Sequence, residues 1–591
     1  MTVFFRSLLV LCILEAAGCG GSGIDGVDEE NNIFVSEPDE IFATQNSTAR
    51  FLTQATFGPI PDQVVAMTGG NASDWIINEF SQPASLVLPE MESFYDFFND
   101  DELSGFASSI STFAYWRNVL AGDDQLRQRM AYALSQILVV SNGGGELLTD
   151  VPEAVGYYMD VLTRNAFGNY RDLMHEVTYT PAMGHYLTYL GNQKGDPATG
   201  RVPDENYARE ILQLFTVGTV ALNPDGTPKT DASDAPVEIY SNSDITGLAR
   251  VFTGLGLSEE SFGTNEEDDI ATLMAQPMAI FEQEHSSLEK RFLGSVIPAN
   301  TSAAESINRA LDVIFNHSNV APFVSRQLIQ RFVTSHPEPA YVARVANAFE
   351  AGTYTLPNGT TVGNARRGDL KATISAILFD EQARTVQSSP FFGKVREPVL
   401  RFSAWTRAFQ VSQITPQYVT ALWDTSGVNS LNQHPYRAAS VFNFYRPGYI
   451  APGTASGTLE LTVPELQIVN AASIPGYANF MTYMVYGRDP VEEAQELAEE
   501  FDEAGVSLDP QAALSSFIPD YQDELDVAAD AAALLALLDQ KLTYGTLSAK
   551  TRTAITEALN NIPLDQDDAE FDRVAVAIVM VVTSADFLVQ R

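Results

Sequence analysis

Four polar residues in one short segment have the spacing of a single helix face. They are Asn206, Arg209, Glu210 and Gln213, at positions i, i+3, i+4 and i+7. An amide, a guanidinium and a carboxylate presented together can orient a polar ligand through charge-assisted hydrogen bonds. The same set can form a buried polar network between helices, or simply a solvated face. The predicted helix 203–216 is therefore the first candidate site. A ligand site, a buried network and a solvated face all remain open as interpretations of it.

The scarce histidines suggest a second kind of site. The chain has six histidines, and His175 and His185 flank a Thr-Pro-Ala-Met turn. Together with Glu210 or Glu176, and with His285 as a further candidate, they offer the ligand types that a divalent metal takes. The residues after His175 lack the second histidine, four positions on, that a zinc-protease helix needs. A divalent metal at His175, His185 and Glu210 is therefore one hypothesis, and histidines that cap helices or satisfy core groups are the simpler one.

A third candidate combines His285 and Lys290. Ser287 and Lys290 fit a Ser-x-x-Lys pattern, in which a lysine can activate a serine. The companion Lys-Thr-Gly and Ser-Asp-Asn motifs are not found in the chain, so we interpret the pattern as a chance match. His285 and Lys290 remain a candidate polar site because they share one short block.

Positive charge is rare in this chain, so its clustering is informative. Four basic residues lie within 14 positions, namely Lys394, Arg396, Arg401 and Arg407. Such a cluster could bind a carboxylate, sulfate or phosphate group. Pairing with the abundant acids is the simpler interpretation.

Several enzyme classes are disfavoured by the motifs that the sequence lacks. It has no phosphate-cradling glycine loop, no Gly-x-Ser-x-Gly elbow, no Cys-x-x-Cys and no haem attachment motif. These observations disfavour a nucleotide-dependent enzyme, a serine hydrolase and a redox-cofactor enzyme.

The first 18 residues have the layout of a secretory leader. Arg6 precedes an apolar run from Leu8 to Leu14, and small residues follow it. The run is too short for a membrane-spanning helix, which needs about 20 residues. Ala16-Ala17-Gly18-Cys19 resembles a bacterial lipobox, in which the cysteine is acylated. The sequence therefore predicts a lipoprotein signal peptide over residues 1–18 and lipidation at Cys19, with ordinary secretion as the alternative.

The next segment is predicted to be an acidic flexible tether over residues 19–45. It carries seven acids and no base, and it holds too little apolar surface to fold alone. Gly20, and not an aspartate, follows Cys19, which by resemblance to enteric sorting rules points to the outer membrane. We expect a cell-envelope protein anchored by acyl chains, each methylene contributing about 0.8 kcal/mol.

Composition narrows the range of partners. The chain of 591 residues has 34 basic and 76 acidic residues, a formal net charge of −42 at pH 7. This balance argues against nucleic acid and against anionic lipid headgroups as partners, and it suggests a salty habitat. Apart from Cys12 in the leader, Cys19 is the only cysteine, so disulfides are not expected in the mature protein.

The periodicity of the sequence is overwhelmingly helical from about residue 47 onward. We predict a mainly α fold, a large multi-helix domain with one or two short β-hairpins. The main domain is expected over residues 46–488, and an acidic C-terminal helical region over 489–591 is expected to pack on it. Asn358-Gly359 between β-forming residues predicts a hairpin within 353–362, and residues 217–240 predict a longer polar excursion.

Six blocks of sequence resemble those of one bacterial family in order and spacing. They are 50–59 (RFLTQATFGP), 165–173 (NAFGNYRDL), 180–183 (TPAM), 203–211 (PDENYAREI), 249–254 (ARVFTG) and 440–449 (SVFNFYRPGY). On these blocks the chain resembles the Domain of Unknown Function 1800 family over most of residues 47–590. The block around Asn206 is the most specific, and Asp204 stands there where the family often has Asn.

The resemblance implies a cellular setting without implying a reaction, because the activity of that family is not established. Its members are typically exported bacterial proteins. They are often encoded beside a second uncharacterised family, number 1501, which looks like alkaline phosphatases and sulfatases. The resemblance therefore implies a paired function at the cell envelope, with that phosphatase- or sulfatase-like protein as a candidate partner.

Two functional hypotheses follow from the sequence. The first is an exported lipoprotein that binds a partner protein or a glycan at the envelope. The alternative is a metal-assisted or hydrolase-like envelope enzyme with a polar pocket around Asn206, Arg209 and Glu210. The enzyme hypothesis requires one set of side chains to converge, namely Asn206, Arg209, Glu210, His175, His185 and His285.

Overall fold

The computed structural model describes residues 41–97, 108–258, 261–263, 269–385, 389, 391–411, 422–486 and 519–591. The predicted leader, Cys19, nearly all of the predicted tether and a candidate helix at 490–504 lie outside these described residues.

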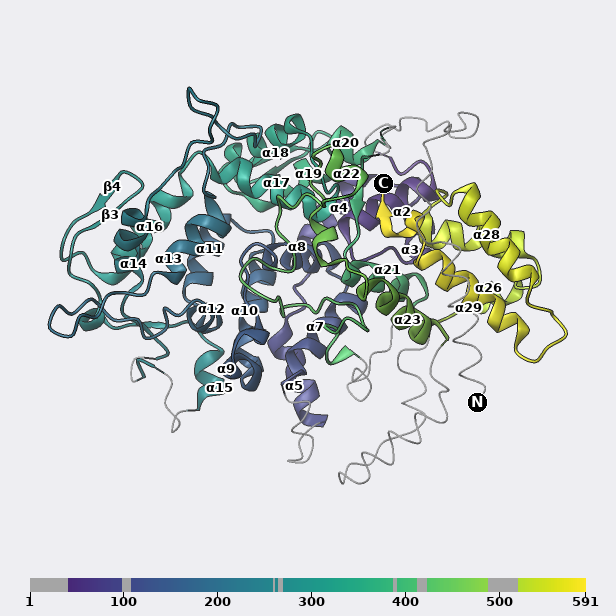
Figure 1. The fold of residues 1–591 in the computed structure, drawn as a ribbon, viewed down its shortest axis with the longest axis horizontal. Coiled ribbons are helices and arrows are strands. Elements are labelled where there is room, and N and C mark those ends of the chain that lie inside the picture. Colours follow the sequence, from purple (N-terminus) through teal and green to yellow (C-terminus); the bar gives the residue numbers. More distant parts are fainter. Residues whose placement is uncertain are drawn as a thin grey trace.

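The described part of the chain is mainly α, as its periodicity predicted. Figure 1 shows α14, α16, β3 and β4 at one end of the long axis and α26, α28 and α29 at the other. Buried apolar side chains from all parts of the chain form one continuous core cluster. No helix in these residues is both long enough and apolar enough to cross a bilayer.

The first part of the chain folds into helices with clear start signals. Asn71 and Asn169 accept backbone hydrogen bonds in the first turn of a helix, and Pro61 and Pro152 occupy first helical positions. The helices of this part are α2 (Gln45–Ala55), α3 (Pro61–Met67), α4 (Ala72–Ser81), α5 (Val87–Phe97), α7 (Ile110–Ala121), α8 (Gln125–Ser135), η2 (Asn142–Gly144), α9 (Glu146–Asp150), α10 (Pro152–Asn165), α11 (Tyr170–Thr178) and α12 (Pro181–Tyr186).

The middle of the chain mixes helices with short strand pairs. Its elements are α13 (Asn206–Glu210), η3 (Ile211–Thr216), α14 (Asn242–Ala249), η4 (Arg250–Phe252), β1 (Leu255–Gly256), α15 (Ile270–Met274), β2 (Ala279–Ile280), η5 (Glu282–Glu284), β3 (Lys290–Phe292), β4 (Ser295–Ile297), α16 (Ala303–Phe315), α17 (Val320–Phe332), α18 (Pro339–Ala351), β5 (Thr353–Thr355), β6 (Thr361–Gly363), α19 (Leu370–Leu378), α20 (Glu381–Arg384), β7 (Lys394–Val395) and α21 (Pro398–Ala408). The strands pair only two at a time, so no larger sheet forms among the described residues.

The last part of the chain contacts the first part. Its elements are α22 (Ala455–Thr458), η7 (Pro464–Ile468), α23 (Ser473–Tyr486), α26 (Gln522–Asp526), α27 (Ala531–Leu538), η8 (Asp539–Thr543), α28 (Ala549–Asn560), α29 (Ala569–Val582), α30 (Ala585–Leu588) and β8 (Val589–Gln590). Strand β8 pairs with β7, and Arg50 Nε donates a hydrogen bond to the backbone oxygen of Arg591 at 2.6 Å. Helix α29 packs on α23, so the acidic C-terminal helices contact the main body, while the domain boundaries themselves stay a prediction.

The structure confirms one hairpin and adds another. Strands β5 and β6 pair in register around Asn358-Gly359, with Gly359 at φ +85°, as the sequence predicted. Strands β3 and β4 form a second hairpin, whose turn residues Leu293 and Gly294 have φ values of 47° and 70°. The sequence did not predict this turn, because leucine is rarely found at positive φ.

The predicted helix 203–216 is shorter and changes type. Helix α13 begins at Asn206, and after Glu210 the chain continues as a π-helix, η3. A π-helix has i→i+5 hydrogen bonds, so the spacing of a regular α-helix does not hold beyond Glu210. The predicted polar face is therefore only partly present: Arg209 is half-exposed, whereas Glu210 is buried.

Candidate functional site

Helix α13 is held in place by the aromatic ring of Tyr207. That ring stacks on Tyr189 with centroids 4.2 Å apart, and its hydroxyl lies 2.8 Å from Thr178 Oγ1. Tyr207 is 2% exposed. Because one side of α13 is fixed in the core, the opposite side presents Asn206 and Arg209 toward solvent.

The exposed side of α13 carries a surface ion pair. Arg209 Nη2 lies 3.4 Å from Glu205 Oε2, and both side chains are more than a third exposed. Glu205 Oε1 also accepts a hydrogen bond from Thr246 on α14 at 2.7 Å. The backbone N–H of Asn206 donates to Asp204 Oδ1 at 2.8 Å. Exposed pairs of this kind contribute about 0–1 kcal/mol, so they leave Arg209 free to exchange partners.

Glu210 is the unusual residue of this segment. Its side chain is 6% exposed, and its Oε2 has no hydrogen-bond partner among the described residues. Burial raises the pKa of Glu210, and the neighbouring charge of Arg209 opposes that rise. A buried carboxylate oxygen without a donor is costly, so an additional donor would stabilise the charged form.

Two tyrosines accompany Glu210, and neither was singled out from the sequence. Burial raises the pKa of Tyr186 and of Tyr240 to about 12 each, and the charge of Glu210 adds to both shifts. The Tyr240 hydroxyl is buried and lacks a hydrogen-bond partner in the described part of the chain. A carboxylate with aromatic rings around it can hold a cationic or a polyhydroxylated group. The tyrosines come from α12 and from the end of the polar excursion, so no local spacing could reveal them.

The structure places the two candidate histidine ligands in separate environments. The ring of His175 lies 4.9 Å from that of Tyr179, the residue directly after α11. The Nε2 atom of His185 lies 3.5 Å from where a Cβ on Gly145 would be. Burial lowers the pKa of both histidines and so favours their neutral forms.

The predicted metal group is not assembled. Within the described ranges, no three His, Cys, Asp or Glu side chains lie close enough to hold a metal ion together. This corrects the hypothesis that His175, His185 and Glu210 form one metal site. The spacing of ten residues between the two histidines imposes no geometry, so nothing local brings them together.

His285 has a structural environment. It is 5% exposed, and its Nδ1 lies 2.8 Å from the carbonyl oxygen of Thr253. A carbonyl only accepts, so Nδ1 donates and Nε2 is left to accept from the Ser306 hydroxyl at 3.2 Å. Both ring nitrogens are thus engaged, and His285 links the end of η4 to α16.

Lys290 lies next to His285 but faces the interior. Its side chain is fully buried, and Nζ donates to the backbone oxygen of Ser286 at 2.8 Å. Burial, together with the charge of Arg250, lowers the pKa of Lys290 to about 8. The charge of Lys290 also lowers the pKa of His285, so the two side chains lie near each other, and a polar ligand site at these residues stays a prediction.

The basic side chains of the cluster at 394–407 make contacts inside the protein. Lys394 Nζ lies 2.5 Å from Glu465 Oε1, and both side chains are buried. Arg407 donates to the backbone oxygens of Gly58 and Leu120 at 2.6 and 2.9 Å. Lys394 thus pairs with an acid, as the simpler interpretation predicted, whereas Arg407 is satisfied by backbone oxygens instead.

A buried polar network around Glu397 was not predicted. The Glu397 carboxylate is 0% exposed and accepts hydrogen bonds from Gln136, Gln433 and Tyr445. Burial alone would raise its pKa, but the charges of Lys394 and Arg129 and these hydrogen bonds outweigh burial and lower it. The partners come from distant parts of the chain, so the network holds the core in one arrangement.

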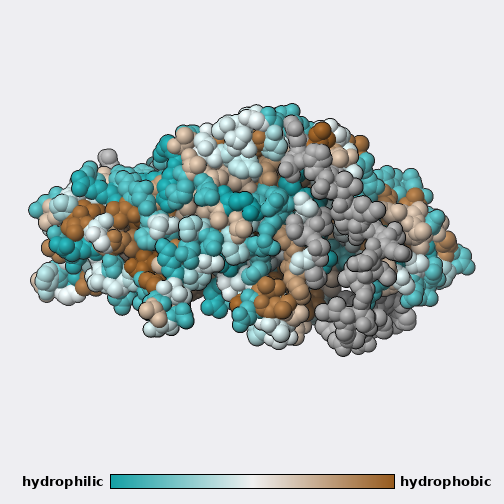
Figure 2. Space-filling view, turned by 90° about the horizontal axis from the view of Figure 1, so that it is seen from above, coloured by the Kyte–Doolittle hydropathy of each residue, from teal (hydrophilic) through white to brown (hydrophobic). Residues whose placement is uncertain are grey.

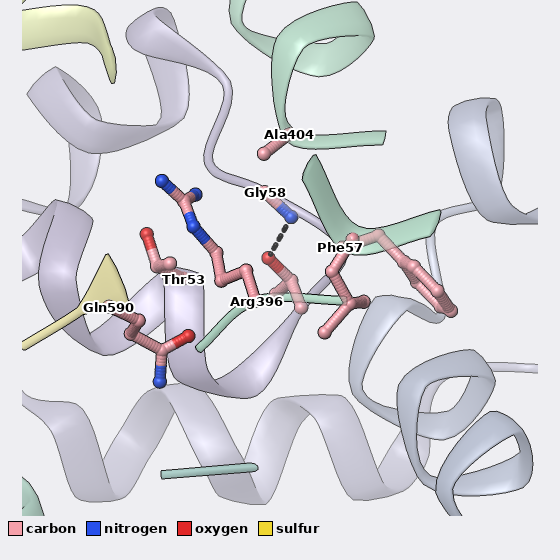
Figure 3. Close-up of a pocket in the computed structure, with 8 residues that line it drawn as sticks. Thr53, Phe57, Gly58, Arg396, Ala404 and Gln590 are labelled. Atoms are coloured by element: carbon pink, nitrogen blue, oxygen red, sulfur yellow. Dashed lines mark hydrogen bonds between the residues drawn. The ribbon is translucent and has the colours of Figure 1, made fainter. Parts of the chain in front are cut away.

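A small cavity lies where the first and last parts of the chain meet (Figure 3). Its volume is about 10 Å³, room for about one water molecule. The residues labelled around it are Thr53, Phe57, Gly58, Arg396, Ala404 and Gln590. This cavity is too small for a substrate, so the candidate site remains the surface around α13.

These features define a large, mainly helical protein whose candidate site is a polar surface over a buried carboxylate. Residues 50–589 match the family described as Protein of unknown function (DUF1800), and the chain belongs to this family. The match covers nearly the whole chain and confirms the resemblance seen in the six sequence blocks. No curated protein and no solved structure shows a significant match to the chain.

Proposed function

We propose that this chain is a lipid-anchored protein of the bacterial cell envelope that binds a glycan through the surface around Asn206, Arg209 and Glu210. The observation that carries the binding site is the buried Glu210 carboxylate, whose Oε2 lacks a donor among the described residues. A sugar hydroxyl supplies such a donor once the side chains that cover Oε2 move aside, and the rings of Tyr186 and Tyr240 offer apolar faces for stacking. The lipid anchor rests on the leader and on Cys19.

Binding is tested with Glu210→Gln, which keeps the shape of the side chain but removes its charge. The purified protein and the variant are titrated by calorimetry with soluble fragments of peptidoglycan and of outer-membrane polysaccharide. Loss of a charged hydrogen bond should weaken binding about tenfold or more. Glu305→Gln is the matched control, because Glu305 is 52% exposed in a surface pair on α16.

Arg209→Ala separates a ligand site from a structural network. Arg209 is 39% exposed, so its removal should abolish ligand binding and leave the thermal unfolding midpoint nearly unchanged. Unfolding of this variant would instead show that the residue holds the helices together, and it would contradict the proposed role.

The envelope location is tested at Cys19. In the native host, a clickable fatty acid should label the chain, and Cys19→Ser should lose the label and leave the outer-membrane fraction. A chain that stays unlabelled, or a variant that fractionates like the parent, would contradict the anchor. A crosslinked pull-down from the same cells tests the phosphatase- or sulfatase-like protein as a partner.

A hydrolase-like enzyme that uses Glu210 at the same surface, without the histidines and without a metal group formed by them, is the second candidate. The specific observation in its favour is that burial raises the pKa of Glu210, as a general acid requires. In this case Glu210→Gln should abolish turnover of an oligosaccharide while binding persists. If the protein binds these fragments but does not cleave them, the enzyme candidate is wrong and only the binding function is supported.

A further inference from the structure

The small cavity between the first and last parts of the chain has a polar lining. Every residue that lines it is buried, and four of them carry polar side chains: Thr53, Thr56, Arg396 and Gln590. Its volume of about 10 Å³ is close to what one water molecule requires. Cavities that stay empty inside proteins are apolar, so a polar lining at this size indicates a bound molecule as small as water.

Arg396 is a charged residue that the fold removes from bulk water. The face of the molecule seen in Figure 2 is mostly hydrophilic and meets solvent, whereas Arg396 is 3% exposed. Its Nε and Nη2 atoms both donate to the carbonyl oxygen of Phe587, and Nη1 has no hydrogen-bond partner in the described part of the chain. Burial lowers the pKa of Arg396, and the groups that oppose this shift are tyrosines, Tyr544 and Tyr477. An unpartnered donor on a buried charge is costly, so Nη1 needs an acceptor.

Gln590 supplies a complementary group on the neighbouring strand. It pairs with Lys394 in the β7–β8 ladder, and the N–H of Arg396 donates to the carbonyl oxygen of Leu588 at 2.8 Å. Gln590 and Arg396 are therefore diagonal neighbours on one side of the ladder, about 7–8 Å apart. Gln590 Nε2 donates to the carbonyl oxygen of Phe332, and Oε1 is buried without a partner among the residues that the structure describes. In Figure 3 the amide oxygen of Gln590 is turned toward the side chain of Arg396.

We propose that one ordered water molecule is bound in this cavity, where it accepts a hydrogen bond from Arg396 Nη1 and donates one to Gln590 Oε1. Water suits the site because it is both donor and acceptor, and the two unpartnered atoms are one donor and one acceptor. Its second hydrogen is left for a hydroxyl oxygen of Thr53 or Thr56, which line the same cavity. A halide ion is a poorer ligand, because Gln590 Oε1 would face its negative charge.

The bound water connects three segments that are distant in the sequence. They are α2 near the start of the described chain, the residues that lead into α21, and β8 at the end. The water also solvates a buried charge, so it is part of the core and not of the surface hydration. The site is independent of the proposed glycan site, because none of the residues around Glu210 line this cavity.

A high-resolution crystal structure of the purified protein tests the site directly. We expect one density peak in the cavity, about 2.7–3.2 Å from both Arg396 Nη1 and Gln590 Oε1. A crystal soaked in sodium bromide is the control, because bromide scatters anomalously and water does not. Three results would overturn the proposal: an empty cavity, an anomalous bromide peak in it, or a direct hydrogen bond from Nη1 to the Tyr544 hydroxyl without a water peak.

A pair of variants at Ala404 tests the same site in solution. Ala404 lies on α21, lines the cavity and is 4% exposed. Ala404→Ser adds a hydroxyl group, which replaces the water and can still donate and accept. Ala404→Cys adds a thiol group, which also displaces the water but forms only weak hydrogen bonds. Serine and cysteine have similar helix propensities, so we expect the serine variant to have the higher thermal unfolding midpoint.

Ala408 is the matched control for this pair. It lies on the same helix, is 2% exposed in the apolar core cluster and does not line the cavity. There we expect Ala408→Cys to have the higher midpoint, because a buried hydroxyl group is costly where no polar cavity receives it. Far-UV circular dichroism checks that each variant is folded. If Ala404→Cys is as stable as Ala404→Ser, or more stable, the cavity holds no hydrogen-bonded water and the proposal is wrong.

Discussion

The buried ion pair between Lys394 and Glu465 shows how much a single residue can decide in this protein. Both side chains are at most 1% exposed, and Glu465 also accepts a hydrogen bond from Ser335 at 2.8 Å. Each charge carries a desolvation penalty, which the opposite charge of its partner helps to offset. Removal of one partner is therefore far more damaging than removal of an exposed pair.

Lys394→Met should destabilise the protein by about 3–5 kcal/mol, because it leaves the buried Glu465 carboxylate without its cationic partner. Chemical denaturation followed by circular dichroism measures this change. Arg309→Met is the matched control, since its pair with Glu305 is 52% exposed on both sides, and it should cost at most about 1 kcal/mol. Equal losses of unfolding free energy in both variants would show that burial of the ion pair does not decide its contribution to stability.

A buried histidine makes stability depend on pH. Burial lowers the pKa of His434 to about 4, although the charge of Asp424 opposes this shift. The unfolded chain protonates the histidine near pH 6.5, so it binds the proton more tightly than the folded protein does. The contribution of His434 is therefore fully present above pH 6.5 and is lost as the pH falls from 6.5 toward 4.

His434→Gln should reduce the loss of unfolding free energy between pH 6.5 and 4 by up to about 3 kcal/mol. Glutamine keeps an acceptor for the Thr425 N–H and a donor for Thr112 but does not titrate in this range. The measurement is the unfolding midpoint of both proteins at each pH. Taking the difference between the two curves removes the effects of other groups, such as Glu79, whose pKa burial raises to about 7. If the unfolding midpoints of the two proteins change in parallel with pH, this part of the acid dependence does not come from His434.

At the scale of elements, close backbone approaches explain several glycines. Gly247 lies in the middle of α14, and a Cβ there would be 1.8 Å from the backbone oxygen of Arg291 on β3. This contact brings α14 against the β3–β4 hairpin. Because α14 also contacts α13 through Thr246 and Glu205, the same packing positions the candidate site.

Gly247→Ala should destabilise the protein by about 1–3 kcal/mol, because the added methyl group must push α14 away from β3. Gly427→Ala is the matched control: nothing lies within 4 Å of its Cβ position, so we expect a change within about 0.5 kcal/mol. Thermal unfolding compares the two. An unchanged unfolding midpoint for Gly247→Ala would contradict this prediction, because it would show that the β3–β4 hairpin moves aside without a loss of stability.

At the scale of the whole molecule, the net charge of −42 opposes compaction. Salt screens this repulsion, since the Debye length falls from about 30 Å at 0.01 M to about 3 Å at 1 M. The thermal unfolding midpoint should therefore rise between 0.01 and 1 M sodium chloride. Choline chloride is the control, and it should act similarly if screening is the cause. A midpoint that is flat or falls with salt would contradict self-repulsion.

Local patterns predicted a good part of this molecule. The helical class follows from the spacing of apolar residues, and the β5–β6 hairpin follows from Asn358-Gly359. The six blocks were enough to indicate the family that the match over residues 50–589 shows. The β3–β4 turn at Leu293 escaped prediction, because long-range packing holds leucine in a conformation that it disfavours.

The sequence by itself determined the class of fold, the family and a polar segment around Asn206, because these depend on neighbours along the chain. Only the tertiary structure decided that Glu210 turns inward beside Tyr186 and Tyr240, while His175 and His185 do not join it in a metal group within the described residues. The physical reason is that burial and hydrogen-bond partners are supplied by segments distant in sequence. A residue type and its local spacing specify what chemistry is available, whereas packing decides which groups meet.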